Sequence, residues 1–116
     1  MVTNGVVLKE TRSSARIALQ CCIIVANGVQ TSEGRVLNLS NSGCFVEAPI
    51  LIKAGDWLQL RLFLPNSNLS ICVSMAVIQW ALGFRFGVEF IEVDEKHRAR
   101  LNHFIATGKD PWTLAH

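Results

Sequence analysis

The sequence predicts an all-β-dominated fold, a small barrel or sandwich of about six strands followed by one α-helix. Three observations predict it. Short apolar runs are separated by turn residues at close spacing, one run alternates with a period of two, and a helical pattern appears only near the end. Half of the 116 residues are hydrophobic and 17% are charged, a balance that excludes an intrinsically disordered chain.

Turn residues mark the boundaries of the expected strands. The run from residue 16 to 25 is rich in Ile, Leu and Cys and stops at Asn27-Gly28. The run from residue 57 to 64 alternates Leu with Trp, Gln, Arg and Phe, which is typical of a strand with one buried face. The expected strands span residues 16–25, 34–39, 44–48, 57–64, 70–80 and 84–90.

The helical pattern begins after residue 90. Asp94 is placed to cap a helix over residues 95–107, and Gly108 is placed to stop it. One face of this helix is apolar, and we expect it to pack on the β-domain or to plug it. The apolar face holds Leu101, Phe104 and Ile105. The polar residues that fall mostly on other faces are Lys96, Arg98, Arg100 and Asn102. We expect residues 108–116 to form a tail.

Charge and cysteine usage narrow the possible partners. Eleven Lys and Arg against nine Asp and Glu leave a net charge of +2, so overall charge does not favour binding to DNA or RNA.

Residues 1–16 do not look like a secretory signal, and no run is long and apolar enough to predict a membrane span. The four cysteines lack a CxxC spacing, so we expect reduced packing residues in the cytoplasm and no metal site.

Two further function classes find little support in the sequence. An enzyme would need a group such as Cys44 paired with a histidine, and nothing in the sequence orders such a pair. A binder of single-stranded nucleic acid would need surface aromatic residues among basic ones. The aromatic residues that we expect in the core instead are Phe45, Trp57, Phe63, Phe84 and Phe86.

Two arginines stand just before the first expected strand. Arg12 and Arg16 would be roughly 13 Å apart if this segment is extended. The planar guanidinium group donates two parallel hydrogen bonds, which suits a phosphate or the O6/N7 edge of guanine. Taken alone, the pair also fits a solvated surface segment, because two arginines at this spacing are common by chance.

A second polar pattern falls where the second expected strand ends. Asn38 and Ser40 face the same way on a strand, and Gly43 is free to adopt a positive φ that lets the chain turn into the third strand. The amide and the hydroxyl offer donors and acceptors that suit a base edge. Taken alone, the pattern also fits a turn whose polar groups satisfy their own backbone.

Together, Arg12-x-x-x-Arg16 and Asn38-x-Ser40-x-x-Gly43 resemble the paired motifs of the PilZ domain family, RxxxR and [D/N]xSxxG. Trp80 and the segment 86–90 are similar to the closing segment of that family. The resemblance covers about residues 9–105 and implies a six-stranded antiparallel β-barrel with a C-terminal α-helix. It implies one domain over residues 1–116, with the barrel at residues 17–90 and the helix at residues 95–107.

The resemblance also implies a ligand, because PilZ domains bind the bacterial second messenger cyclic di-GMP. By similarity, Arg12 and Arg16 would contact guanine and phosphate. Asn38 and Ser40 would hydrogen-bond a guanine, and Gly43 would shape the turn. The flexible segment of residues 1–16 would close over the ligand.

Asn38 occupies a position where many members of that family have Asp. Asn donates hydrogen bonds as well as accepting them, so we expect it to tune the affinity rather than to abolish binding. Further ligand contacts are expected from three residues near the two motifs and near the end of the fifth strand, which are Thr11, Ser42 and Trp80.

The function that the resemblance implies is that of a cytoplasmic bacterial receptor, not an enzyme. It would transmit the signal to an unidentified downstream protein when its N-terminal arm closes. The alternative is a PilZ-like adaptor that acts through protein contacts without a ligand. Both share the fold, and the two intact motifs favour the receptor.

Overall fold

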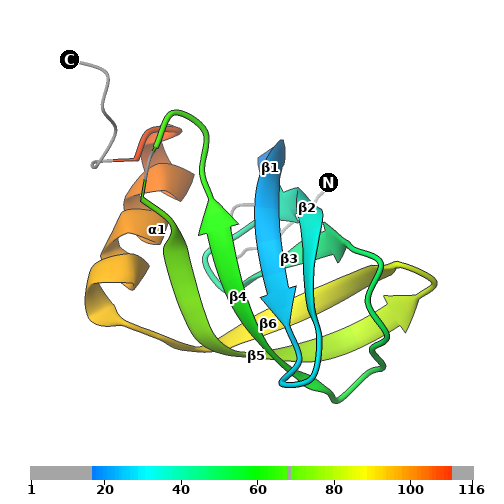
Figure 1. Cartoon of the computed structure of the whole chain (residues 1–116). Helices are drawn as coiled ribbons and strands as arrows, with labels where there is room; N and C mark the ends of the chain where they lie inside the picture. Colours follow the sequence, from blue (N-terminus) through cyan, green and yellow to red (C-terminus); the bar gives the residue numbers. More distant parts are fainter. Residues whose placement is uncertain (1–16, 68, 111–116) are drawn as a thin grey trace, which may run out of the picture.

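The computed structural model describes residues 17–67 and 69–110, which form a closed barrel of six strands with one helix beside it (Figure 1). The elements are β1 (Ile17–Ala26), β2 (Thr31–Leu39), β3 (Gly43–Glu47), β4 (Trp57–Phe63), β5 (Ile71–Leu82), β6 (Arg85–Val93) and α1 (Glu95–Thr107). Neighbouring strands are antiparallel and follow the order β1-β2-β3-β6-β5-β4, with β4 pairing back to β1. The predicted fold class is confirmed.

Alternation along the strands fills the barrel with apolar side chains. In β4, Leu58, Leu60 and Leu62 are buried, and the residues between them are exposed. This is the buried face that the period of two predicts. Burial of one such side chain stabilises the fold by about 2 kcal/mol, so the shared interior is the main source of stability.

Strands β2 and β6 each extend three residues beyond an end that the sequence predicted. β2 begins at Thr31 rather than at residue 34, because the preceding turn is tight. Asn27 Oδ1 accepts hydrogen bonds from two N–H groups of that turn, at 2.9 and 2.7 Å. Pairing with β1 therefore resumes at once, with Ala26 opposite Thr31. β6 continues to Val93 rather than ending at residue 90, because it still pairs with β5 there.

Helix α1 has the caps that the sequence predicted. Asp94 Oδ1 accepts a hydrogen bond from the N–H of Lys96 at 2.9 Å. Gly108 adopts the left-handed conformation with φ 76° and donates to the carbonyl of Phe104 at 2.7 Å. Leu101 and Phe104 are buried in the core and α1 contacts β5, so the helix packs on the barrel. In the part of the chain that the structure describes, no helix has the length and apolar character that a membrane crossing requires.

Arg100 departs from the prediction that the polar helix residues lie on other faces. It is 5% exposed and forms an ion pair with Asp110, with 2.6 Å between Nη2 and Oδ2. The same guanidinium group donates to the carbonyls of Leu69 and Ser70, at 2.6 and 3.0 Å. Because a carboxylate and two carbonyls satisfy its donors, the cation is tolerated inside, and it ties the loop before β5 to the helix.

The aromatic residues are less buried than the sequence predicted. Of the five expected in the core, only Phe86 is fully enclosed, and Phe45 is half-buried. Trp57, Phe63 and Phe84 are 54%, 36% and 58% exposed. The first two occupy outward positions of β4, whose inward positions are taken by leucine, and Phe84 lies at the β5–β6 hairpin.

Candidate functional site

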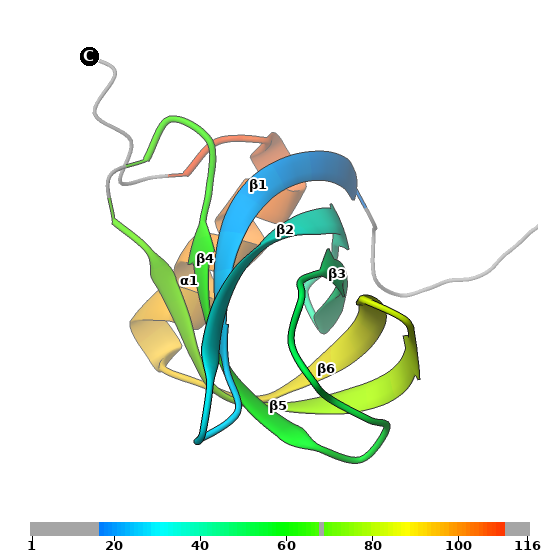
Figure 2. The same cartoon turned by 45° about the vertical axis from the view of Figure 1, so that its right-hand side comes forward.

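Four strands bring the predicted Asn38 and Trp80 onto one row of the barrel. Asn38 of β2 is opposite Phe45 of β3, Phe45 is opposite Gly87 of β6, and Gly87 is opposite Trp80 of β5. Leu39, which follows Asn38, is fully buried, so Asn38 faces outward. These four opposed residues are termed the outer row. With strands about 4.8 Å apart, the row is about 14 Å long. Figure 2 shows β2, β3, β6 and β5 following one another around the barrel.

The indole of Trp80 lies across Gly87 and meets the ring of Phe45. A Cβ on Gly87 would come within 2.8 Å of the indole Cε2 and would clash with its Nε1. The ring centroids of Trp80 and Phe45 are 5.3 Å apart with an interplanar angle of 80°, which is an edge-to-face contact. Trp80 remains 39% exposed. The missing side chain at Gly87 therefore makes room for a partly exposed aromatic platform.

The turn after β2 is held by the hydroxyl of Ser40. This residue is 1% exposed, and its Oγ accepts hydrogen bonds from the N–H groups of Ser42 and Gly43, each at 3.2 Å. The Ser40 N–H also donates to the carbonyl of Gly43 at 2.9 Å. In this conformation the hydroxyl stabilises the turn, and a direct contact with guanine stays a prediction.

Gly43 serves close packing rather than an unusual backbone angle. A Cβ at this position would clash with the carbonyl oxygen of Val88 on β6. The prediction of a positive φ is wrong, because Gly43 already belongs to β3 and pairs with Glu89, so the chain has turned before it reaches this residue. The glycines that do have a positive φ in the described chain are Gly28, Gly55, Gly83 and Gly108.

A charged row lies beside the outer row on the same strands. Glu47 of β3 accepts hydrogen bonds from the Nε of Arg35 at 2.8 Å and from the Nε of Arg85 at 3.1 Å. The hydrogen bond from Arg35 has the larger effect and that from Arg85 the smaller, and together they hold the pKa of Glu47 below its ordinary value. Glu47 is two positions from Phe45 and faces the same way. Two guanidinium groups and one carboxylate leave one positive charge next to the outer row.

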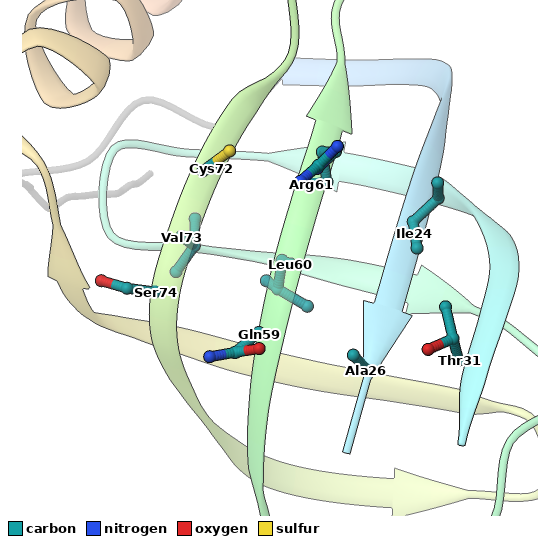
Figure 3. Close-up of a pocket in the computed structure, with 9 residues that line it drawn as sticks. All are labelled: Ile24, Ala26, Thr31, Gln59, Leu60, Arg61, Cys72, Val73 and Ser74. Carbon is teal, nitrogen blue, oxygen red and sulfur yellow. The ribbon is translucent and has the colours of Figure 1, made fainter. Parts of the chain in front are cut away.

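A hollow of about 480 Å³ lies on a different wall, across β1, β4 and β5. Figure 3 shows Arg61 of β4 between Ile24 of β1 and Cys72 of β5, and the strand register places the same three residues opposite one another. The described site residues do not line this hollow, so it is separate from the outer row. Across residues 17–67 and 69–110, no group of three His, Cys, Asp or Glu residues is arranged to hold a metal ion.

Comparison with known protein families matches residues 10–107 of the chain to the PilZ domain. The chain belongs to the PilZ domain family. This bacterial family consists generally of cyclic di-GMP receptors, and its members are receptors and adaptors rather than enzymes. A search of curated proteins finds no match.

Solved PilZ structures share the fold of this PilZ domain. The structure of the Bacillus subtilis inhibitor of motility, MotI/DgrA, matches with a TM-score of 0.73 and 16% identity, covering 84% of this chain and 51% of that one. The PilZ domain of CeSA from a cellulose-synthesizing bacterium matches with a TM-score of 0.63 and 19% identity, covering 79% of this chain and 95% of that one. The chain therefore spans about half the length of the MotI/DgrA chain, and the likeness supports the fold alone.

Most of the predicted site residues of this PilZ domain lie in its described part. The outer row holds Asn38 and Trp80. The turn at the end of β2 holds Ser40, Ser42 and Gly43. The predicted residues outside the described part are Thr11, Arg12 and Arg16. Ile17, the first described residue, is opposite Leu39, so β1 begins beside the end of β2.

Two residues of the outer row were missing from the predicted PilZ site. Phe45, expected in the core, faces outward because Cys44 and Val46 on either side of it point inward. The period of two around Cys44 is the signal that would have identified it. Gly87 carries no such signal, because the ring that covers it comes from β5 and depends on the register between β5 and β6.

Proposed function

We propose that this PilZ domain is a receptor for cyclic di-GMP that binds the messenger on the outer row and passes the signal to a protein partner. The observation that carries the proposal is the strand register that brings Asn38, Phe45 and Trp80 onto one wall. An amide beside an aromatic platform offers hydrogen bonds and stacking, the two interactions by which proteins recognise an unstacked base.

Asn38 supplies the polar contact to a guanine base. Its amide offers both a donor and an acceptor, and a guanine edge presents both kinds of partner. A carboxylate at this position would only accept. The amide therefore changes the pattern of hydrogen bonds and tunes the affinity, while the contact itself is retained.

Trp80 supplies the stacking surface. Stacking of one base on an aromatic side chain is worth about 1–3 kcal/mol. The indole already rests on Gly87 and against Phe45, so its orientation is set before the ligand arrives. A platform ordered in advance loses less conformational entropy on binding.

Arg12 and Arg16 supply the positive charge for the two phosphates of the messenger. Guanidinium groups bind phosphate through two parallel hydrogen bonds. Both arginines precede Ile17, which is paired with Leu39 at the end of β2. We infer that residues 1–16 close over the bound messenger, and that further contacts come from Thr11 and Ser42.

Ser40 and Gly43 contribute chiefly through the shape of the turn. The Ser40 hydroxyl binds the backbone of the turn, and Gly43 lets β3 approach the Val88 carbonyl of β6. A direct contact between Ser40 and guanine would require its hydroxyl to leave those backbone groups.

The proposal treats residues 1–116 as one signalling domain that acts in the bacterial cytoplasm. The cysteines of the described chain are thiols rather than disulfides, which fits a reducing compartment. Since the proposal includes no catalytic step, the change that follows binding acts through a downstream protein. A closing N-terminal arm is an order–disorder or hinge change of the kind by which receptors signal.

Calorimetric titration with cyclic di-GMP tests the proposal. Wild type should bind, and Arg12→Ala and Arg16→Ala should each weaken binding by at least about tenfold, since each removes a charge-assisted hydrogen bond. Arg61→Ala, which removes an exposed guanidinium group from the other wall, should bind like wild type. Equal heats for all four proteins, or no heat for wild type, would contradict the proposal and favour the ligand-independent adaptor.

A further inference from the structure

Helix α1 is joined to the turn of the second motif at Asn41, which it contacts twice. Arg98 Nη1 donates a hydrogen bond to the Asn41 carbonyl at 2.9 Å. The Asn41 side chain donates in turn from Nδ2 to Asn102 Oδ1, at 2.7 Å. The backbone and the side chain of one turn residue are therefore both held by the helix.

The spacing on the helix makes this double contact possible. Arg98 and Asn102 are four positions apart, so they lie on the same helix face, one turn from each other. The contact of Arg98 is half-buried, and a hydrogen bond from a charged donor is among the stronger ones in proteins. Arg98 therefore carries more of the connection than the exposed contact of Asn102.

Asn41 lies in the middle of the motif, between Ser40 and Ser42. On the far side of the turn, the Ser42 carbonyl accepts a hydrogen bond from the N–H of Phe90 at 2.8 Å. The turn is thus held by β6 on one side and by α1 on the other. Asn38 of the outer row is three residues before Asn41, so a displaced turn would also move the end of β2.

We propose that Arg98 and Asn102 are positioning residues for the messenger site: they hold the turn after β2 in the conformation that binds the ligand, without touching it. This inference rests on the proposed receptor function. Because coupling between two sites is reciprocal, a ligand that holds the turn also stabilises the contact with α1. Helix α1 is then the element through which occupancy of the outer row reaches a surface outside that row.

Calorimetric titration of helix variants with cyclic di-GMP tests the inference. Arg98→Ala should weaken binding about tenfold, and Asn102→Ala about threefold. Arg98→Lys keeps a cationic donor and should recover part of the affinity, whereas Arg98→Met, which keeps a side chain of similar length without a donor, should not. Lys96→Ala, an exposed change on the same helix, should bind like wild type.

A double-mutant cycle separates positioning from general stability. Asn41→Ala removes the side-chain bond to Asn102 but keeps the carbonyl that Arg98 binds, so Asn41→Ala and Asn102→Ala together should weaken binding no more than either does alone. If wild type does not bind, the receptor proposal fails. If wild type binds and the Arg98→Ala and Asn102→Ala variants bind as tightly as wild type, the positioning inference fails and the receptor proposal stands. Should Arg98→Ala not fold, the exposed Asn102→Ala decides the result.

Discussion

Gly43 of β3 and Gly87 of β6 lie on neighbouring strands, and at each of them other atoms occupy the space that a side chain would need. At Gly43 the space is taken by the backbone carbonyl of Val88, and at Gly87 by the indole of Trp80. Backbone cannot easily give way, whereas a side chain can rotate out. Substitution at Gly43 therefore threatens the barrel itself, and substitution at Gly87 threatens the aromatic platform.

Gly87→Ala should lower the affinity for cyclic di-GMP about tenfold, because the added methyl group displaces the Trp80 indole from the outer row. Trp80→Ala should have a similar effect, and the double variant should be no weaker than either single one. Titration calorimetry measures all three, with urea denaturation as the control for folding. Additive losses in the double variant would show that Gly87 acts in some other way.

The two adjacent cysteines of β1 should differ in reactivity. Burial first, and the neighbouring Cys22 second, raise the pKa of the Cys21 thiol to about 11, so little of the reactive thiolate is present at neutral pH. Cys22 is exposed. Brief alkylation of the native protein followed by mass spectrometry should modify Cys22 well before Cys21 and the buried Cys44. Preferential modification of Cys44 would contradict this prediction and would support the alternative of an enzyme with Cys44 as its nucleophile.

At the scale of elements, the predictable features were those set by neighbours in the sequence. The alternation of β4 and the two caps of α1 depend on residues a few positions apart, and both appear as expected. The burial of Arg100 was not predictable, because its acceptors lie in the loop before β5 and at Asp110. The connection from Arg98 to Asn41 likewise depends on how the helix docks.

Asp110→Ala should destabilise the protein by about 3–5 kcal/mol, because it leaves the buried Arg100 guanidinium without its carboxylate. Urea denaturation at neutral pH measures the change. Glu47→Gln removes the carboxylate from two surface ion pairs, with Arg35 and with Arg85, and should shift the unfolding midpoint much less. Equal shifts in the two variants would contradict the assignment of Arg100 and Asp110 as the stronger pair.

The whole molecule presents two different walls. The wall of β2, β3, β6 and β5 carries the outer row, and the wall of β1, β4 and β5 carries the hollow around Arg61. The two motifs in the sequence point to the first wall through Asn38, and binding of the messenger there stays a prediction. They did not reveal Phe45, whose outward position follows from the alternation around Cys44, or Gly87, whose place under Trp80 depends on the register between β5 and β6.

The central claim is that the messenger binds the outer row, and amide chemical shifts measured during a titration of the isotope-labelled protein with cyclic di-GMP test it most directly. We predict the largest shifts at Asn38, Phe45, Gly87 and the Trp80 indole N–H, with Ile24 and Arg61 nearly unchanged. Shifts concentrated around Arg61, with the outer row unaffected at saturation, would contradict the account.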